Sequence, residues 1–140
     1  MATPSPARIA DTEKITINLG FVDLGRIDLL VREGFYASRS DMIRAAIRAQ
    51  LDRHDAAVSP TIVREDFMMG LRDISRIELQ ALADANEMLD LRVIGLARFA
   101  RDIPAGLVSA TIRSVEVLGT IQASAEVKKA LAASRHSKGR

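Results

Sequence analysis

The chain has 140 residues, of which 48% are hydrophobic and 27% charged, so its composition is that of a folded globular protein. Because it contains no cysteine, it has neither a disulfide framework nor a thiolate metal site, and its two histidines stand alone in the sequence. Its formal charge of +2 is too small to indicate nucleic-acid binding by bulk electrostatics, so such a function has to rest on particular side chains.

The first segment, residues 1–12, has two prolines, small side chains and no hydrophobic periodicity, which predicts a flexible arm. The N-terminus lacks the apolar core of a signal peptide, and no apolar run approaches the roughly 20 residues needed to cross a bilayer. We therefore expect a soluble, cytoplasmic protein with no membrane partner.

A short strand is predicted at the segment KITINLG, which begins at Lys14, because polar and apolar side chains alternate there. The polar face carries Lys14, Thr16 and Asn18, and the apolar face carries Ile15, Ile17 and Leu19. No second strand follows nearby, and an isolated strand leaves its backbone hydrogen-bonding groups unpaired. The strand therefore needs a partner from another chain.

Two helices are predicted after the strand. The first begins at Phe21, has apolar residues at helical spacing for about three turns, and stops at Gly34, which supplies a left-handed turn. The second begins with Ser38 and Asp41, a variant of the capping box that usually carries Glu or Gln at its last position. Pro60 is expected to end the second helix, and we place a domain boundary there.

The domain formed by residues 13–58 is too small to fold alone, because two helices with narrow apolar faces bury little surface. This deficit disappears if two chains pair their strands antiparallel over a shared four-helix core. The residues expected in this dimer core are Ile15, Ile17, Leu19, Ile27, Leu30, Ile43 and Ile47. The polar strand face then forms a doubled row that points outward.

The order of strand, helix, glycine turn and serine-capped helix resembles the ribbon-helix-helix DNA-binding domain of the MetJ/Arc and CopG type. The resemblance covers about residues 13–54, and SRSDMIRAAIR is its most specific motif. It implies that a two-stranded antiparallel ribbon, one strand from each chain, enters the major groove of double-stranded DNA and reads the base edges.

The resemblance also implies which residues touch DNA. The base-reading positions are Lys14, Thr16 and Asn18. The lysine can donate to guanine, the asparagine can pair with adenine, and the threonine can contact thymine. The phosphate-binding positions are Ser38, Arg39 and Ser40, at the start of the second helix. Free backbone N–H groups and the positive end of the helix dipole favour an anion there.

A repeat with an offset of 24 residues is visible in the second half of the chain, over residues 61–133. The segments LRVIGLARFARDIPAGL and VEVLGTIQASAEVKKAL align Gly95 with Gly119, and a weaker copy places Gly70 at the equivalent position. Self-similarity near this period is typical of architectures in which each unit buries its apolar side against the next.

Each copy is predicted to form an alternating strand through its glycine and then a short helix, capped by Ser75, Asp102 or Ser124. Successive strands joined by helices would form a small parallel sheet with helices on one side. A chance similarity within a domain rich in alanine and leucine is the alternative, and the sequence leaves both open.

No catalytic residue, cofactor or metal site is expected. No carboxylate pair accompanies a histidine, no glycine-rich loop matches a phosphate cradle, and residues 55–135 contain no histidine that could serve a metal sensor. Residues 134–140 are basic and small, and we expect them to be disordered.

The fold class expected is α+β, with an N-terminal dimeric ribbon-helix-helix domain followed by a small C-terminal α/β domain. The predicted function is that of a non-enzymatic, sequence-specific transcriptional regulator of the nucleoid, a repressor that binds double-stranded DNA as a homodimer. The C-terminal domain would build a higher oligomer or bind a protein partner. Two alternatives stay open, namely an antitoxin whose C-terminal half binds a toxin, and a scaffold that polymerises by stacking its repeats.

Overall fold

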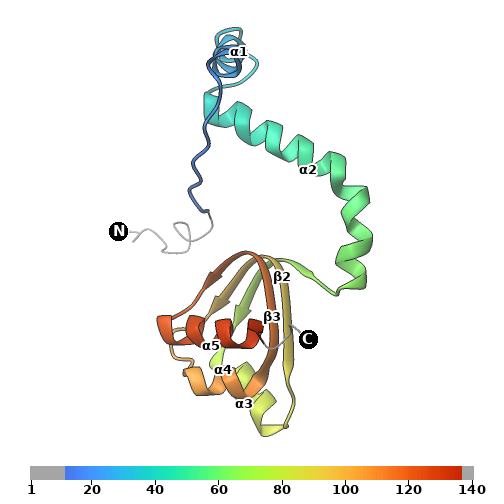
Figure 1. Ribbon diagram of the computed structural model, residues 1–140, viewed down its shortest axis with the longest axis vertical. Coiled ribbons are helices and arrows are strands. Elements are labelled where there is room, and N and C mark those ends of the chain that lie inside the picture. The colour runs from blue at the N-terminus through green and yellow to red at the C-terminus, as the bar shows by residue number, and fades with distance from the viewer. Residues whose placement is uncertain (1–11, 137–140) are drawn as a thin grey trace, which may run out of the picture. The chain divides into compact units, whose positions relative to one another are not determined.

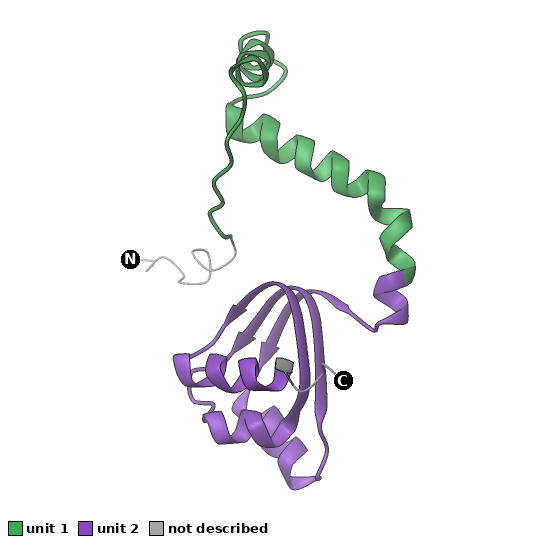
Figure 2. Ribbon diagram, in the orientation of Figure 1, with its two compact units in different colours: residues 1–60 green, residues 61–140 purple. Residues whose placement is uncertain are grey.

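The computed structural model describes residues 12–136, and the chain divides into two compact units, residues 1–60 and 61–140 (Figure 2). The first unit contains an extended segment, helix α1 (Phe21–Arg32) and most of helix α2 (Arg39–Arg64). The second unit contains the three strands and the remaining three helices of the described residues.

The predicted start and stop of the first helix and the predicted start of the second helix are confirmed. Helix α1 starts at Phe21, and the chain turns at Gly34, whose φ of +83° lies in the left-handed region that glycine adopts without strain. Ser38 caps α2, because its Oγ accepts the backbone N–H of Asp41 at 3.1 Å. The Asp41 carboxylate in turn accepts the N–H of Ala37, the residue before the cap, at 3.0 Å, which is a variant of the capping box.

The prediction that Pro60 ends the second helix is wrong, since α2 continues through it to Arg64. A proline removes only its own N–H from the helical ladder, although its ring also crowds the preceding turn. The next turn closes on carbonyls that follow the proline: the N–H of Glu65 donates to the carbonyl of Thr61 at 2.9 Å. The helix therefore tolerates the interruption.

The predicted strand at the N-terminus is not a strand within the single chain. Residues 12–20 are extended, and no strand in the described part of the chain pairs with them. A strand is defined by a hydrogen-bonded neighbour, and the sequence analysis expects that neighbour to come from another chain.

The second unit alternates strands and helices. Its elements are β1 (Met68–Ile74), α3 (Arg76–Asp84), β2 (Leu89–Phe99), α4 (Ala105–Thr111), β3 (Ile112–Gln122) and α5 (Ala125–His136). The strands form a parallel sheet in the order β1-β2-β3, and Figure 1 shows the three helices side by side on one side of it. The buried side chains of the sheet and helices form one core, centred on Ile74, Leu79, Val93, Val108, Val127 and Leu131.

The sheet register confirms the repeat. Gly70 pairs with Gly95, and Gly95 pairs with Gly119, so the three glycines form one line across the sheet. All three have φ between +123° and +138°, which L side chains rarely adopt. A Cβ on Gly95 would lie 2.2 Å from the carbonyl oxygen of Gly70, and one on Gly119 would lie 2.1 Å from that of Gly95. At one level of the sheet, the glycines thus allow neighbouring backbones to approach closely in a conformation that other residues rarely adopt. Figure 1 shows that all three strands are bent.

Two of the three predicted helix caps are present in the second unit. The hydroxyls of Ser75 and Ser124 each accept the backbone N–H three residues further on, at 3.1 and 3.2 Å. Asp102 does not cap its helix, contrary to the prediction, because α4 begins only at Ala105 with Pro104 at the N-cap position. The carboxylate is therefore too far back along the chain to reach the first turn.

Candidate nucleic-acid interface

The polar side chains of the extended segment face solvent. Lys14, Thr16 and Asn18 are all exposed, and within residues 12–136 their side chains make no hydrogen bond or ion pair. Their donors and acceptors are consequently available to a ligand. Alternate positions thus carry an ammonium group, a hydroxyl with a methyl group, and an amide. These are groups that can distinguish bases in the major groove.

The apolar side of the same segment is also uncovered in the single chain. Ile15 is 73% exposed and Ile17 is 53% exposed, and Leu19 is exposed as well. Alternating residues of an extended segment point to opposite sides, so these side chains cannot share a surface with the polar ones. A row of large apolar side chains open to water is a surface that a folded protein normally covers.

The predicted dimer-core residues of the two helices are only partly covered by one chain. Ile27 is buried, at 8% exposure, whereas Leu30 and Ile43 are half-buried and Ile47 is exposed. Helix α2 has no buried residue along its 26 positions. The described residues of the first unit therefore lack a closed core of their own.

The start of α2 offers backbone donors for an anion. The N–H groups of Arg39 and Ser40 precede the first helical hydrogen bond, which runs from Met42 to the carbonyl of Ser38 at 3.1 Å. No helical carbonyl can reach them, and the side chains of Ser38, Arg39 and Ser40 are all exposed beside them. The Ser38 hydroxyl is already engaged as the cap, so the other groups are the freer donors.

Arg39 has a partner that the sequence did not reveal. Its Nε donates to Asp28 Oδ1 at 2.7 Å and its terminal nitrogen donates to Oδ2 at 2.8 Å, which joins α2 to α1. These hydrogen bonds lower the pKa of Asp28 and raise that of Arg39. The two residues are 11 positions apart on different helices, and no spacing rule connects such a pair. Asp28 thus offsets charge that Arg39 would present to a phosphate.

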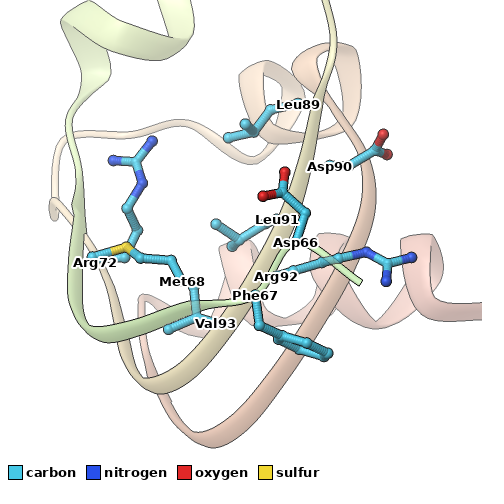
Figure 3. A pocket seen from close by; sticks show the side chains of 9 residues that line it. All are labelled: Asp66, Phe67, Met68, Arg72, Leu89, Asp90, Leu91, Arg92 and Val93. Carbon is cyan, nitrogen blue, oxygen red and sulfur yellow. The ribbon is translucent and has the colours of Figure 1, made fainter. Parts of the chain in front are cut away.

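A small pocket lies in the second unit, where β1 begins (Figure 3). It has a volume of about 200 Å³ and is lined by residues 66–68, Arg72 and residues 89–93. Three of its four charged side chains already have partners: Arg72 pairs with Glu78, Asp90 pairs with Arg113, and Arg92 donates to the carbonyl of Glu65 and lies over the Phe67 ring. The fourth, Asp66, forms no ion pair within residues 12–136. These contacts hold the first residues of the strands together, and we assign the pocket no ligand.

The described residues show neither a metal centre nor a membrane span. Among them, no group of three or more histidine, cysteine, aspartate or glutamate side chains could hold a metal ion. No helix in that part of the chain is long and apolar enough to pass through a bilayer. His54 approaches Gln50 on the same helix, at 3.1 Å between the two nitrogens. Residues 1–11 of the predicted arm (residues 1–12) and residues 137–140 of the predicted tail lie outside the described residues. Residues 134–136, which were also predicted to be disordered, belong to helix α5.

Comparison with known protein families identifies a match over most of the chain. A family model described as the Ribbon-Helix-Helix transcriptional regulator family matches residues 10–128, which spans the extended segment, both helices of the first unit and most of the repeat. No curated protein and no solved structure matches the chain. The family match covers the resemblance seen in the sequence and extends it through β3.

Proposed function

Because the chain belongs to the Ribbon-Helix-Helix transcriptional regulator family, a non-enzymatic family of DNA-binding proteins, we propose that it represses transcription by reading a specific DNA sequence as a homodimer. In this proposal two chains pair residues 14–19 as an antiparallel ribbon that lies in the major groove. A dimer seated there would block access to a promoter, and the cytoplasm is the proposed location.

The observation that carries the proposal is the uncovered apolar side of the extended segment. Ile15 and Ile17 are exposed in one chain, although every second residue there is large and apolar. A second copy, paired strand to strand, would cover these side chains and would satisfy the backbone groups of both segments. The half-covered residues Leu30 and Ile43 would close the same core.

The proposed dimer leaves Lys14, Thr16 and Asn18 on its outer side, and these are the proposed base readers. Two copies related by a two-fold axis give each side chain twice, so the DNA site should be an inverted repeat. The single cation in each row limits the electrostatic part of the affinity, and sequence discrimination would rest mainly on Asn18 and Thr16.

We further propose that the start of α2 positions the ribbon by holding a DNA phosphate. The free N–H groups of Arg39 and Ser40 and the adjacent hydroxyl of Ser40 can donate to phosphate oxygens. Such a contact fixes the register of the protein on the duplex and carries no sequence information. Ser38 would contribute chiefly by holding the helix end in shape.

An antitoxin function is less well supported. A toxin-masking tail is expected to stay unfolded until its partner arrives. The second unit instead has a parallel sheet, three helices and a shared apolar core. We therefore favour a regulator with a folded C-terminal domain.

The experiment that tests base reading uses Asn18→Ala. Once footprinting on genomic DNA has located the bound site, the variant should lose about 1–3 kcal/mol of affinity there and keep its affinity for unrelated DNA. Gln80→Ala removes an exposed amide from the second unit and should change neither affinity. An equal loss on every DNA sequence would mean that Asn18 does not read a base.

A further inference from the structure

Neither outer edge of the sheet in the second unit has a neighbouring strand within residues 12–136. In that part of the chain β1 and β3 each pair only with β2. The β1 edge also exposes large apolar side chains, with Met69 at 62% and Leu71 at 44%. Natural proteins usually blunt such an edge with charges or cover it.

The two open edges are complementary halves of one contact. Inside the sheet, the missing Cβ of Gly95 makes room for the carbonyl oxygen of Gly70, and that of Gly119 makes room for the carbonyl oxygen of Gly95. At the β1 edge, Gly70 has the same positive φ, and nothing lies within 4 Å of its missing Cβ. At the β3 edge, the carbonyl of Gly119 is the next in the series. A Gly119 carbonyl from a second copy would fit the space at Gly70.

The side chains on the open side of the sheet continue in the same way. Ile94 adjoins Met69 on one side and Leu118 on the other, which makes one apolar row across the three strands. If β3 of another copy lay beside β1 in this register, its Leu118 would adjoin Met69 and extend the row. The packing order α3, α4, α5 runs the same way as the strands, so the helical layer could continue too.

We propose that the second unit docks a second copy of this chain head to tail, with the β3 edge of one copy against the β1 edge of the next. The contact repeats the parallel pairing that the chain makes twice internally. Because the two surfaces differ, a pair joined in this way keeps an unused edge at each end, and further copies can link DNA-bound dimers into a row. The inference rests on the second unit alone and stands whether or not the N-terminal ribbon reads DNA.

The test is sedimentation of the full-length chain over a range of concentrations. The wild-type protein should form species larger than the dimer, in proportions that rise with concentration. Met69→Lys at the β1 edge and Leu118→Glu at the β3 edge should each weaken this association by about tenfold, because each places a charge in the apolar row. Both positions are exposed in the single chain, so the variants should fold.

Combining the two substitutions in one chain gives the decisive variant. In the proposed register the new lysine of one copy adjoins the new glutamate of the next, and the association should recover by several fold over either single variant. Ile77→Lys is the matched control. Ile77 is 82% exposed and lies on the side of α3 opposite the buried Leu79, so the association should stay unchanged.

Three results would overturn the proposal. The wild-type chain could remain a dimer at all concentrations up to about 1 mM, well above the range of specific association. Met69→Lys could disrupt the larger species while Leu118→Glu leaves them intact, which would indicate a symmetric contact between two β1 strands. The combined variant could show no recovery. Binding of dilute dimers to a single DNA site should be the same for all these variants, which separates this test from that of the proposed function.

Discussion

The ion pair between Arg39 and Asp28 governs how much positive charge the start of α2 can offer to DNA. The Asp28 carboxylate holds the guanidinium through two hydrogen bonds, and both side chains are accessible to solvent. A DNA phosphate arriving at this helix end would compete with the carboxylate for the same donors. In the proposed phosphate contact, the pair would lower affinity for all DNA sequences alike and leave discrimination between them untouched.

Removing the charge of Arg39 and removing the charge of Asp28 should have opposite effects on the affinity for DNA. Arg39→Ala should weaken binding to every DNA sequence and lower the salt slope of log K by about one unit. Asp28→Asn should tighten binding to every sequence, because the guanidinium is released. Asp52→Asn is the control. It removes the same negative charge from an exposed position on α2, so it measures the effect of net charge alone. Titrations at several salt concentrations measure all three, and a loss confined to the specific site after Arg39→Ala would rule out the phosphate role.

Asp90 makes the second unit sensitive to acid. Hydrogen bonds from Arg113 and then from Ser114 hold its pKa far below the usual range, and Arg98 lowers the pKa of Asp73 in the same manner. A carboxyl whose pKa is lower in the folded state binds protons more readily when unfolded. The stability it contributes is present above the unfolded pKa of about 3.9 and is lost as the pH falls below that value.

The acid sensitivity can be measured by thermal unfolding between pH 7 and pH 2. The wild-type midpoint should fall steeply below about pH 4. Asp90→Asn should be less stable at pH 7 and should lose less on acidification. Asp102→Asn changes a carboxylate that forms no ion pair among the described residues and should follow the wild-type curve. A wild-type curve that is flat to pH 2 would contradict the linkage.

At the scale of elements, the line of three glycines allows neighbouring backbones of the sheet to approach closely. Gly95 combines a positive φ with a carbonyl oxygen 2.2 Å from the position of a Cβ. Gly95→Ala should therefore cost more than about 2 kcal/mol of unfolding free energy, from backbone strain and overpacking together. Gly106→Ala, in helix α4 with nothing within 4 Å, should stabilise the unit by about 0.5–1 kcal/mol. Urea denaturation distinguishes the two, and equal small effects would show that the contact is not rigid.

The elements that the sequence predicted correctly are those with a local or periodic signal. The cap at Ser38, the stop at Gly34 and the 24-residue repeat each depend on residues a few positions, or one period, apart. The end of α2 was missed because the next turn forms its bonds without the Pro60 nitrogen. The Arg39–Asp28 pair was missed because it depends on how α1 meets α2, which no pattern encodes. The Asp73–Arg98 pair was within reach, since the repeat offset places both residues at one level of the sheet.

At the scale of the whole molecule, the proposed dimer core would decide whether the first unit folds. Ile17→Lys should bury one unpaired charge from each chain in the shared core, at a cost of several kcal/mol. The full-length chain should then lose the ribbon dimer in sedimentation and lose its binding to DNA. Ile77→Lys, an equivalent change on the exposed side of α3, should leave both intact. A variant of Ile17 that still sediments as the wild type does would contradict the dimer.

The two units have different proposed roles. The first unit would read DNA through a surface that exists only in the dimer, and the second would connect dimers through the edges of its sheet. In this proposal neither surface is complete in one chain, which would account for apolar residues as exposed as Ile15 and Met69 in a chain with an otherwise ordinary globular composition.

The most direct test of the ribbon is cysteine scanning of residues 14–19, because the chain has no cysteine of its own. Each single-cysteine variant is treated with a thiol reagent, alone and with excess sheared genomic DNA. Without DNA, positions 15, 17 and 19 should be protected by the dimer core, and positions 14, 16 and 18 should react. With DNA, positions 14, 16 and 18 should become protected as well. Six positions that react equally, and that DNA does not protect, would contradict a DNA-reading ribbon.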